Sequence, residues 1–209
     1  MSRYVTLARD GEAEIEVKRS RFLCTLARVE DEEAARAVVD RMRRQHWDAR
    51  HHCSAFVLGP SGALQRSSDD GEPSGTAGAP MLEVLRGRGV SDVVAVVTRW
   101  FGGVLLGAGG LVRAYGDSVR AGLDEVGLLT RELVGELRVE LDHADAGRVE
   151  GELRARGVAV LDVGYADVVS LLLGVPPEGE ARVRAAVAEL TGGGVTPVVV
   201  GQRWVDLAG

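Results

Sequence analysis

Three carboxylates and two hydroxyls lie close together in the segment D-D-G-E-P-S-G-T-A-G, residues 69–78. Asp69, Asp70 and Glu72 are followed by Ser74 and Thr76. Such a cluster can hold a cation, act as a general acid or base, or recognise an anion through backbone N–H groups and hydroxyls. It lacks the ligand alternation and the distal Glu of an EF-hand loop. We favour a plainer interpretation, a tight turn in which Ser74 or Thr76 caps the following helix.

A glycine-rich segment, W-F-G-G-V-L-L-G-A-G-G-L-V-R-A-Y at residues 100–115, follows a predicted buried strand and leads into a helix. Exposed backbone N–H groups at a helix start can cradle an anion. The segment is neither a P-loop, because no Lys-Ser or Lys-Thr follows, nor G-x-G-x-x-G. Close packing of strand against helix is the alternative. We expect Gly107, Gly109 and Gly110 to need positive φ or a close backbone approach.

A basic segment, R-H-H-C, occupies residues 50–53. Neighbouring strand residues point to opposite faces, so His51 and His52 are not expected to share a metal, nor His52 and Cys53 to form a nucleophile pair. If the fold brings the loops together, a basic rim forms, with the carboxylates of residues 69–72 on its opposite edge. The rim arginines and histidine are Arg50, His51, Arg99 and Arg113.

Such a rim suits a phosphate-bearing partner, and we expect structured RNA or a ribosomal site. Aromatic stacking candidates are few, namely Trp100, Phe101 and Tyr115, and the first two also fit a core. The candidate nucleic-acid- or anion-binding residues are Arg50, His51, His52, Arg99, Gly102, Gly103, Gly107, Gly109, Gly110 and Arg113.

Composition excludes several classes of protein. The net charge of the 209 residues is −6, so bulk charge does not indicate a strongly basic nucleic-acid binder. Residues 1–130 carry 17 basic and 18 acidic residues, whereas residues 131–209 carry 8 and 13. Any basic surface must therefore be local, and we place it in residues 1–130.

Cysteine use and hydropathy indicate the compartment. Cys24 and Cys53 have no zinc-site spacing, the N-terminus has no apolar signal-peptide core, and no apolar run reaches membrane-helix length. We expect a reduced, cytoplasmic protein without a membrane partner, a metal, a cofactor or catalytic residues. The oligomeric state is not predicted.

Hydrophobic periodicity predicts the elements that position these motifs. Residues 4–29 are expected to form two or three strands with a break at Ser20-Arg21, followed by a helix from Asp31 to about Trp47. Residues 52–58 and 63–67 form a hairpin, residues 80–87 a helix, residues 93–98 a buried strand, and a further helix ends near Gly127. Residues 131–209 read as β-α-β-β-α-β, the ferredoxin-like pattern. We predict an α+β protein of two domains, residues 1–130 and 131–209.

The motifs resemble those of a known family. A-R-H-H-C at residues 49–53, the segment at 69–82, the segment at 96–115 and K-R-S-R-F at 18–22 are similar to the IMPACT family, in particular its bacterial YigZ-like branch. Residues 131–209 resemble the companion domain of that branch in length and pattern. The resemblance covers nearly all of residues 18–120 with specific motifs.

The resemblance implies a fold and a function. The N-terminal domain would have a βαβ fold like the second domain of a small-subunit ribosomal protein and domain IV of elongation factor G, and the C-terminal domain would resemble domain V of that factor. Eukaryotic relatives act in translational control by competing for the activator of an initiation-factor kinase. That partner is not transferable to this chain, because their extra N-terminal domain has no counterpart here. No catalytic set is assigned to the family.

The leading hypothesis is a non-enzymatic, translation-associated regulator that binds RNA, a ribosome or a translation factor through the N-terminal domain. The alternative is a small-ligand or phosphate-binding enzyme that uses the glycine-rich and acidic loops. A third interpretation is a protein-interaction module that docks through its C-terminal sheet.

Overall fold

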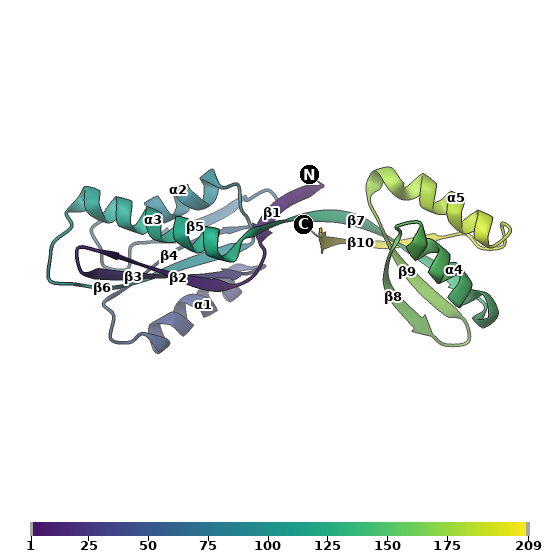
Figure 1. Ribbon diagram of the computed structural model, residues 1–209, viewed down its shortest axis with the longest axis horizontal. Helices are drawn as coiled ribbons and strands as arrows, with labels where there is room; N and C mark the ends of the chain where they lie inside the picture. The colour runs from purple at the N-terminus through teal and green to yellow at the C-terminus, as the bar shows by residue number, and fades with distance from the viewer. Residues whose placement is uncertain (1, 208–209) are drawn as a thin grey trace. The chain divides into compact units, whose positions relative to one another are not determined.

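The computed structural model describes residues 2–207 and shows an α+β protein with two antiparallel sheets (Figure 1). The chain divides into two compact units, residues 3–130 and residues 131–206, which we call the N-terminal and C-terminal units. Each unit has its own buried apolar core.

The N-terminal unit contains a five-stranded sheet in the order β2-β3-β6-β4-β5, with antiparallel neighbours throughout. In chain order, the helices and strands of the N-terminal unit are β1 (Arg3–Leu7), β2 (Gly11–Val17), β3 (Ser20–Arg28), α1 (Glu32–Gln45), β4 (His51–Leu58), β5 (Leu64–Ser68), α2 (Gly78–Gly87), β6 (Val93–Trp100) and α3 (Ala108–Val126).

Helices cover both faces of this sheet (Figure 1). Val96 of β6 packs with Met42 of α1 on one face, and Val97 packs with Met81 of α2 and Tyr115 of α3 on the other. Strand side chains alternate between faces, so β6, buried on both sides, reads as a continuous apolar run. We call the two sides the α1 face and the α2/α3 face.

Local sequence explains α1. The side chain of Asp31 caps the helix by accepting a hydrogen bond from the N–H of Ala34 at 2.7 Å. Acidic residues occupy the first turn and basic residues the last, which complements the helix dipole. The helix begins where predicted and ends at Gln45, two residues before Trp47.

Two predicted boundaries were wrong in ways that matter for function. The chain turns between β2 and β3 at Lys18 and Arg19, whose φ values are 48° and 67°, and not at Ser20-Arg21. Positive φ at both central residues is typical of a type I′ turn, but neither residue is the Gly or Asn that would signal one. Strand β6 continues to Trp100 instead of ending at 98, which places Arg99 inside the sheet.

The C-terminal unit has the predicted element order β-α-β-β-α-β. Its elements are β7 (Leu128–Leu141), α4 (His143–Ala155), β8 (Ala159–Tyr165), β9 (Val169–Val175), the 3-10 turn η1 (Pro177–Gly179), α5 (Glu180–Leu190) and β10 (Val198–Asp206). Antiparallel pairing gives the order β10-β7-β9-β8. Both helices pack on one face, where Leu153 and Val187 meet Leu137 and Leu171. No helix within residues 2–207 is long and apolar enough to cross a membrane.

Candidate functional site

The sequence motifs meet at one end of the N-terminal sheet. Strands β3 and β4 begin there and β6 ends there, with Arg21 opposite Trp100 and His51 opposite Arg99. The acidic segment at residues 69–78 starts at the same end, directly after β5. The fold therefore brings these loops to one end of the sheet, where their side chains have different roles.

Asp69 organises the acidic segment. Its Oδ1 accepts hydrogen bonds from the N–H groups of Ala77 at 3.0 Å and Gly78 at 2.8 Å, and its Oδ2 accepts one from Gly75 at 2.7 Å. Burial acts to raise the pKa of Asp69, but the hydrogen bonds from Gly75, Gly78 and Ala77 prevail and hold it below its ordinary value. Asp69 thus satisfies the free N–H groups at the start of α2.

The predicted capping residues of α2 were wrong. Thr76 donates its hydroxyl to the carbonyl of Pro73 at 2.6 Å, and Ser74 is exposed. Capping comes instead from Asp69, eight and nine positions before the N–H groups of Ala77 and Gly78. A cap supplied from so far along the chain leaves no local pattern for sequence reasoning to find.

Asp70 links the acidic segment to β4 and α1. Its Oδ2 accepts the backbone N–H of His52 at 2.7 Å, and its Oδ1 pairs with Arg43 of α1 at 2.7 Å. His51 Nδ1 lies 3.0 Å from the carbonyl of Asp70, whereas His52 Nε2 lies 3.1 Å from the carbonyl of His46. Within residues 2–207 no group of three or more His, Cys, Asp or Glu side chains is arranged to hold a metal ion.

Glu72 and Arg99 form the centre of a buried polar network on the α2/α3 face. Glu72 Oε1 accepts hydrogen bonds from Arg99 Nη1 at 2.5 Å and from the hydroxyl of Tyr115 at 2.8 Å. Cys53 Sγ lies 3.3 Å from that hydroxyl, and Arg99 Nη2 lies 3.4 Å from Ser20 Oγ. The network joins β3, β4, β6, α3 and the acidic segment.

The network is not poised for nucleophilic chemistry. Burial raises the pKa of Cys53 to about 12, and the nearby carboxylates of Glu72, Asp70 and Asp69 act in the same direction. Burial, assisted by Cys53 and Glu72, also raises the pKa of Tyr115 above its ordinary value. Both groups are therefore protonated at neutral pH. A protonated thiol is a poor nucleophile, because the reactive form of cysteine is the thiolate. The network serves to hold the end of the sheet together.

The five glycines of the glycine-rich segment differ in their backbone φ and in the space around their Cα atoms. A Cβ on Gly102 would lie 2.0 Å from the carbonyl of Arg19, so only glycine fits there. Gly103 and Gly107 have φ values of 83° and 73°. Gly110 has no positive φ, but a Cβ there would lie 3.0 Å from Leu106 Cβ. Gly109 has neither a positive φ nor an atom within 4 Å of its Cβ position. The prediction of a positive φ or a close backbone approach was therefore wrong for Gly109.

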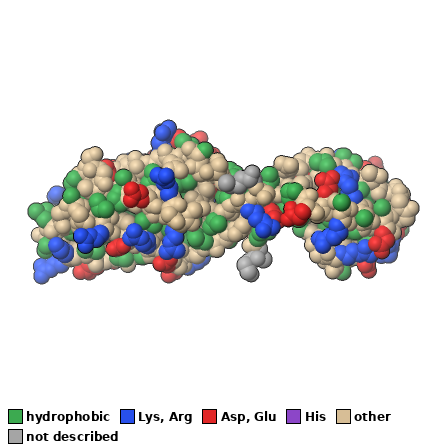
Figure 2. All heavy atoms as spheres, turned by 90° about the horizontal axis from the view of Figure 1, so that it is seen from above, with side chains coloured by type: hydrophobic (Ala, Val, Ile, Leu, Met, Phe, Trp, Pro, Cys, Tyr) green, Lys and Arg blue, Asp and Glu red, His purple; other side chains and the backbone are tan. Residues whose placement is uncertain are grey.

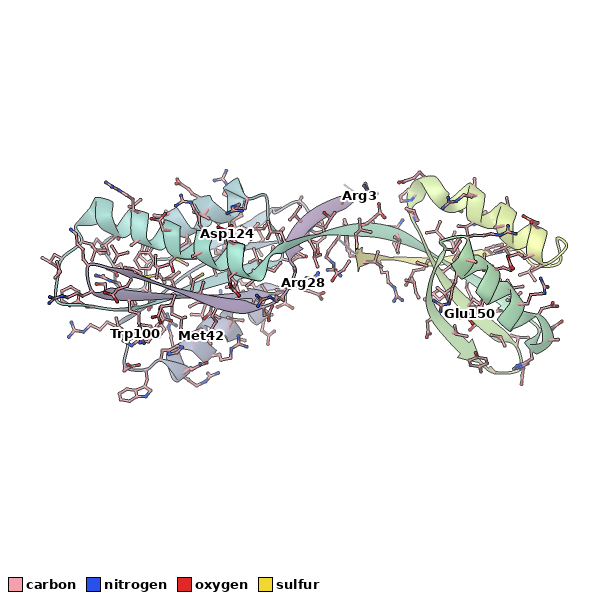
Figure 3. The ribbon with its side chains drawn as sticks, in the orientation of Figure 1. Arg3, Arg28, Met42, Trp100, Asp124 and Glu150 are labelled. Atoms are coloured by element: carbon pink, nitrogen blue, oxygen red, sulfur yellow. The ribbon has the colours of Figure 1, made fainter. Side chains whose placement is uncertain are left out.

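Trp100 is the centre of a second cluster, on the α1 face (Figure 3). The guanidinium of Arg21 lies 3.9 Å from the centroid of its ring, and the ring of His46 contacts it edge-on at 5.3 Å. Its indole N–H donates to Asp48 at 2.9 Å. These contacts hold the end of α1 and the beginning of β3 against the end of β6.

Further basic and aromatic residues lie in the segments that meet at Trp100. Trp47 follows His46 and is 82% exposed, and Phe101 follows Trp100 and is 50% exposed. The Lys18–Arg19 turn lies against Gly102. Arg50 directly precedes His51, the β4 residue that pairs with Arg99. We use the name Trp100 surface for Trp100 and the basic and aromatic residues of the four segments that meet at this end of the sheet. These residues are Lys18, Arg19, Arg21, Arg44, Trp47, Arg50, Trp100 and Phe101.

Four cations of this surface are exposed and have no acidic partner among the described residues. They are Lys18, Arg19, Arg44 and Arg50. Arg21 is the exception, since it pairs with Glu14 at 3.4 Å. Figure 2 shows one side of the unit, with Lys and Arg side chains along one edge and acidic side chains interspersed among them.

Two arginines of the predicted rim lie elsewhere. Arg99 is buried, because its strand continues into the core of the sheet end and its charge is neutralised by Glu72. Arg113 is exposed and lines the groove between α2 and α3 with Arg88 and Arg120. The rim as predicted therefore does not form; of its four members, Arg50 is the one on the Trp100 surface.

Sequence reasoning missed Lys18, Arg19 and Trp47 as candidate residues. The K-R-S-R-F segment at residues 18–22 was noticed only as a family motif. Trp47 lies beyond the helix and off the buried stripe of Ala35, Val38 and Met42. That departure from the stripe was a usable sign that Trp47 faces solvent.

Comparison with known proteins identifies the family. Residues 18–123 match the Impact N-terminal domain, and residues 139–193 match a domain of unknown function, DUF1949. IMPACT family member YvyE of Bacillus subtilis is 43% identical over 190 residues, which cover 91% of this chain and 88% of YvyE. IMPACT family member YigZ of Escherichia coli is 39% identical over 180 residues, covering 85% and 88%.

A solved structure agrees with this assignment. The crystal structure of a protein described as hypothetical matches with a TM-score of 0.64 and 36% identity, and covers 96% of this chain and 98% of that one. Residues 18–123, which match the Impact N-terminal domain, include the residues that build the buried network and the Trp100 surface. This chain belongs to the IMPACT family, as a bacterial member similar to YvyE and YigZ.

Proposed function

We propose that this protein is a non-enzymatic regulator associated with translation, whose N-terminal unit binds RNA through the Trp100 surface. The observation that carries the proposal is that exposed cations without acidic partners and two exposed aromatic rings occur in the segments that meet at one end of the N-terminal sheet. Cationic side chains contact phosphates, and aromatic rings contact bases. The net charge of −6 would limit binding to other polyanions, so we expect affinity only where this surface fits.

The finer fold assignment belongs to the same proposal. We propose that the N-terminal unit is like the second domain of a small-subunit ribosomal protein and domain IV of elongation factor G, and the C-terminal unit like domain V. The strand order β10-β7-β9-β8, with both helices on one face, supports a ferredoxin-like C-terminal unit. Because such domains act on the ribosome, the proposed fold is consistent with ribosomal RNA as the ligand. The exposed side chains, rather than the fold, carry the functional argument.

The enzyme alternative is weaker because the acidic segment has no free carboxylate. Asp69 accepts three backbone N–H groups, Asp70 pairs with Arg43 and the N–H of His52, and Glu72 pairs with Arg99 and Tyr115. A carboxylate held by strong hydrogen bonds is poorly suited to exchange protons with a substrate or to coordinate a cation.

Ribosome co-sedimentation tests the proposal. The protein is expected to pellet with ribosomes at low salt and to dissociate as salt increases, because phosphate contacts release counterions. The double variant Arg44→Ala/Arg50→Ala is expected to pellet less. Arg113→Ala is the matched control, since it removes an exposed arginine of the α2–α3 groove. Absence of pelleting at low salt, or equal losses in both variants, would overturn the proposal.

A further inference from the structure

We infer that the Trp100 surface binds unpaired nucleotides, with Trp47 and Phe101 as the rings on which bases stack. This inference rests on the proposed function and narrows its ligand from RNA in general to single-stranded RNA. The two rings and the exposed cations come from separate segments, which are the end of α1, the β2–β3 turn, the start of β4 and the end of β6.

Trp47 is the strongest single observation. An indole that is 82% exposed leaves most of a large apolar ring in water. Two of the exposed cations, Arg44 and Arg50, precede and follow Trp47 in the sequence. Phe101 is 50% exposed, and the guanidinium of the buried Arg99 lies 5.7 Å from its ring centroid. One side of Phe101 is thus supported from within the unit, and the remaining exposed area is open to a ligand.

Trp100 is not one of these rings. Its face is covered by the guanidinium of Arg21, its edge contacts His46 and its N–H is bonded to Asp48. Trp100 instead fixes the residues on both sides of Trp47, because His46 and Asp48 are the sequence neighbours of Trp47. Trp47 is therefore presented at a defined place while its own ring stays free.

The ring exposure favours a single strand over a duplex. The bases of an RNA duplex are stacked on one another, and its shallow minor groove offers hydroxyls and phosphates rather than base faces. Unpaired bases offer those faces, and stacking on an aromatic side chain tolerates any base sequence. Lys18, Arg19, Arg44 and Arg50 would then contact the phosphates of the same short segment.

Equilibrium binding of a labelled single-stranded RNA oligonucleotide and of its duplex to the full chain tests this inference. We expect the single strand to bind more tightly. Trp47→Ala is expected to weaken single-strand binding about 5- to 150-fold, the range for loss of one stacked base, with little effect on the salt dependence. Trp47→Phe, which keeps a ring, should restore most of the affinity.

Two controls separate stacking from folding. Tyr165→Ala removes a side chain of the C-terminal unit that is 74% exposed and should leave the affinity unchanged. Tryptophan fluorescence of the unmodified chain should be quenched by the single strand, and Trp47→Phe should lose that quenching although Trp100 and Trp204 remain. Because Trp47 is exposed, its variants should keep the circular dichroism spectrum of the parent.

The outcomes distinguish this inference from the proposed function. Equal affinity for single strand and duplex, or equal effects of Trp47→Ala and Tyr165→Ala, would overturn the inference and leave RNA binding standing. Failure of both RNAs to bind at low salt would overturn the proposed function as well. In that case the exposed rings would indicate an acidic protein partner instead.

Discussion

Arg99 and Glu72, 27 positions apart, form an ion pair inside the N-terminal unit, with side chains only 7% and 4% exposed. The pair ties the acidic segment to the end of β6. Tyr115 and Ser20 join it from α3 and β3. The residues of the motifs therefore divide into those that hold the end of the sheet together and those that face a partner.

Removal of one partner of this pair should destabilise the protein strongly. Glu72→Ala leaves the Arg99 guanidinium buried without a counter-charge, a change that typically costs about 3–5 kcal/mol of folding free energy. Urea unfolding of the variant should show a midpoint shifted to lower denaturant. Glu189→Ala, which breaks the exposed pair with Arg156, is the control and should shift the midpoint little. Similar shifts in both variants would contradict the structural role of Glu72.

Two glycines of the same segment should respond in opposite directions to alanine. Gly102→Ala places a Cβ 2.0 Å from the carbonyl of Arg19 and should destabilise the unit. Gly109→Ala meets no atom within 4 Å and lies in the first turn of α3, so it should be neutral or stabilise by up to about 1 kcal/mol. Thermal unfolding of the two variants measures this contrast, and a loss of stability in Gly109→Ala would refute it.

The effect of Asp69 on stability should depend on pH. Its folded-state pKa lies below the ordinary value, so its contribution is complete above the unfolded pKa of about 4 and is lost as pH falls through the folded pKa. Asp69→Asn should therefore be less stable than the parent near pH 7, by about 1 kcal/mol or more, and the difference should shrink in acid. Urea unfolding at several pH values checks this; a difference that grows on acidification would contradict it.

Both thiols should be unreactive in the folded protein. Burial raises the pKa of Cys24 to about 12 and that of Cys53 to about 12, with Glu12 acting in the same direction on Cys24. Few thiolates are then present at pH 8. A colorimetric disulfide reagent should titrate neither cysteine in the native state and both in denaturant. Rapid native labelling of Cys53 would show that the buried network opens.

Sequence periodicity predicted most of the fold because apolar residues repeat with the period of each element. The stripe of Ala35, Val38 and Met42 gives α1, and the apolar run that starts at Val93 gives β6. The Lys18–Arg19 turn was missed because both residues adopt positive φ without the glycine or asparagine that usually signals it.

The site was harder to predict because pairing over long separations decides its chemistry. In the sequence, Arg99 has the features of a surface cation. In the structure it pairs with Glu72, which also accepts a hydrogen bond from Tyr115. In the sequence, Asp69 has the features of a metal ligand. In the structure its carboxylate accepts hydrogen bonds from the N–H groups of Ala77 and Gly78. A single sequence shows which charges exist, but which of them remain free depends on tertiary contacts.

The salt dependence of RNA binding tests the central claim most directly. The measurement is the affinity for one single-stranded RNA at several salt concentrations, for the parent, Arg50→Ala and Arg113→Ala. If the Trp100 surface binds phosphates, Arg50→Ala should reduce the slope of log affinity against log salt by about 0.7, the value for neutralisation of one phosphate fewer, and Arg113→Ala should leave it unchanged. An unchanged slope in Arg50→Ala, or the same reduction in both variants, would contradict the account.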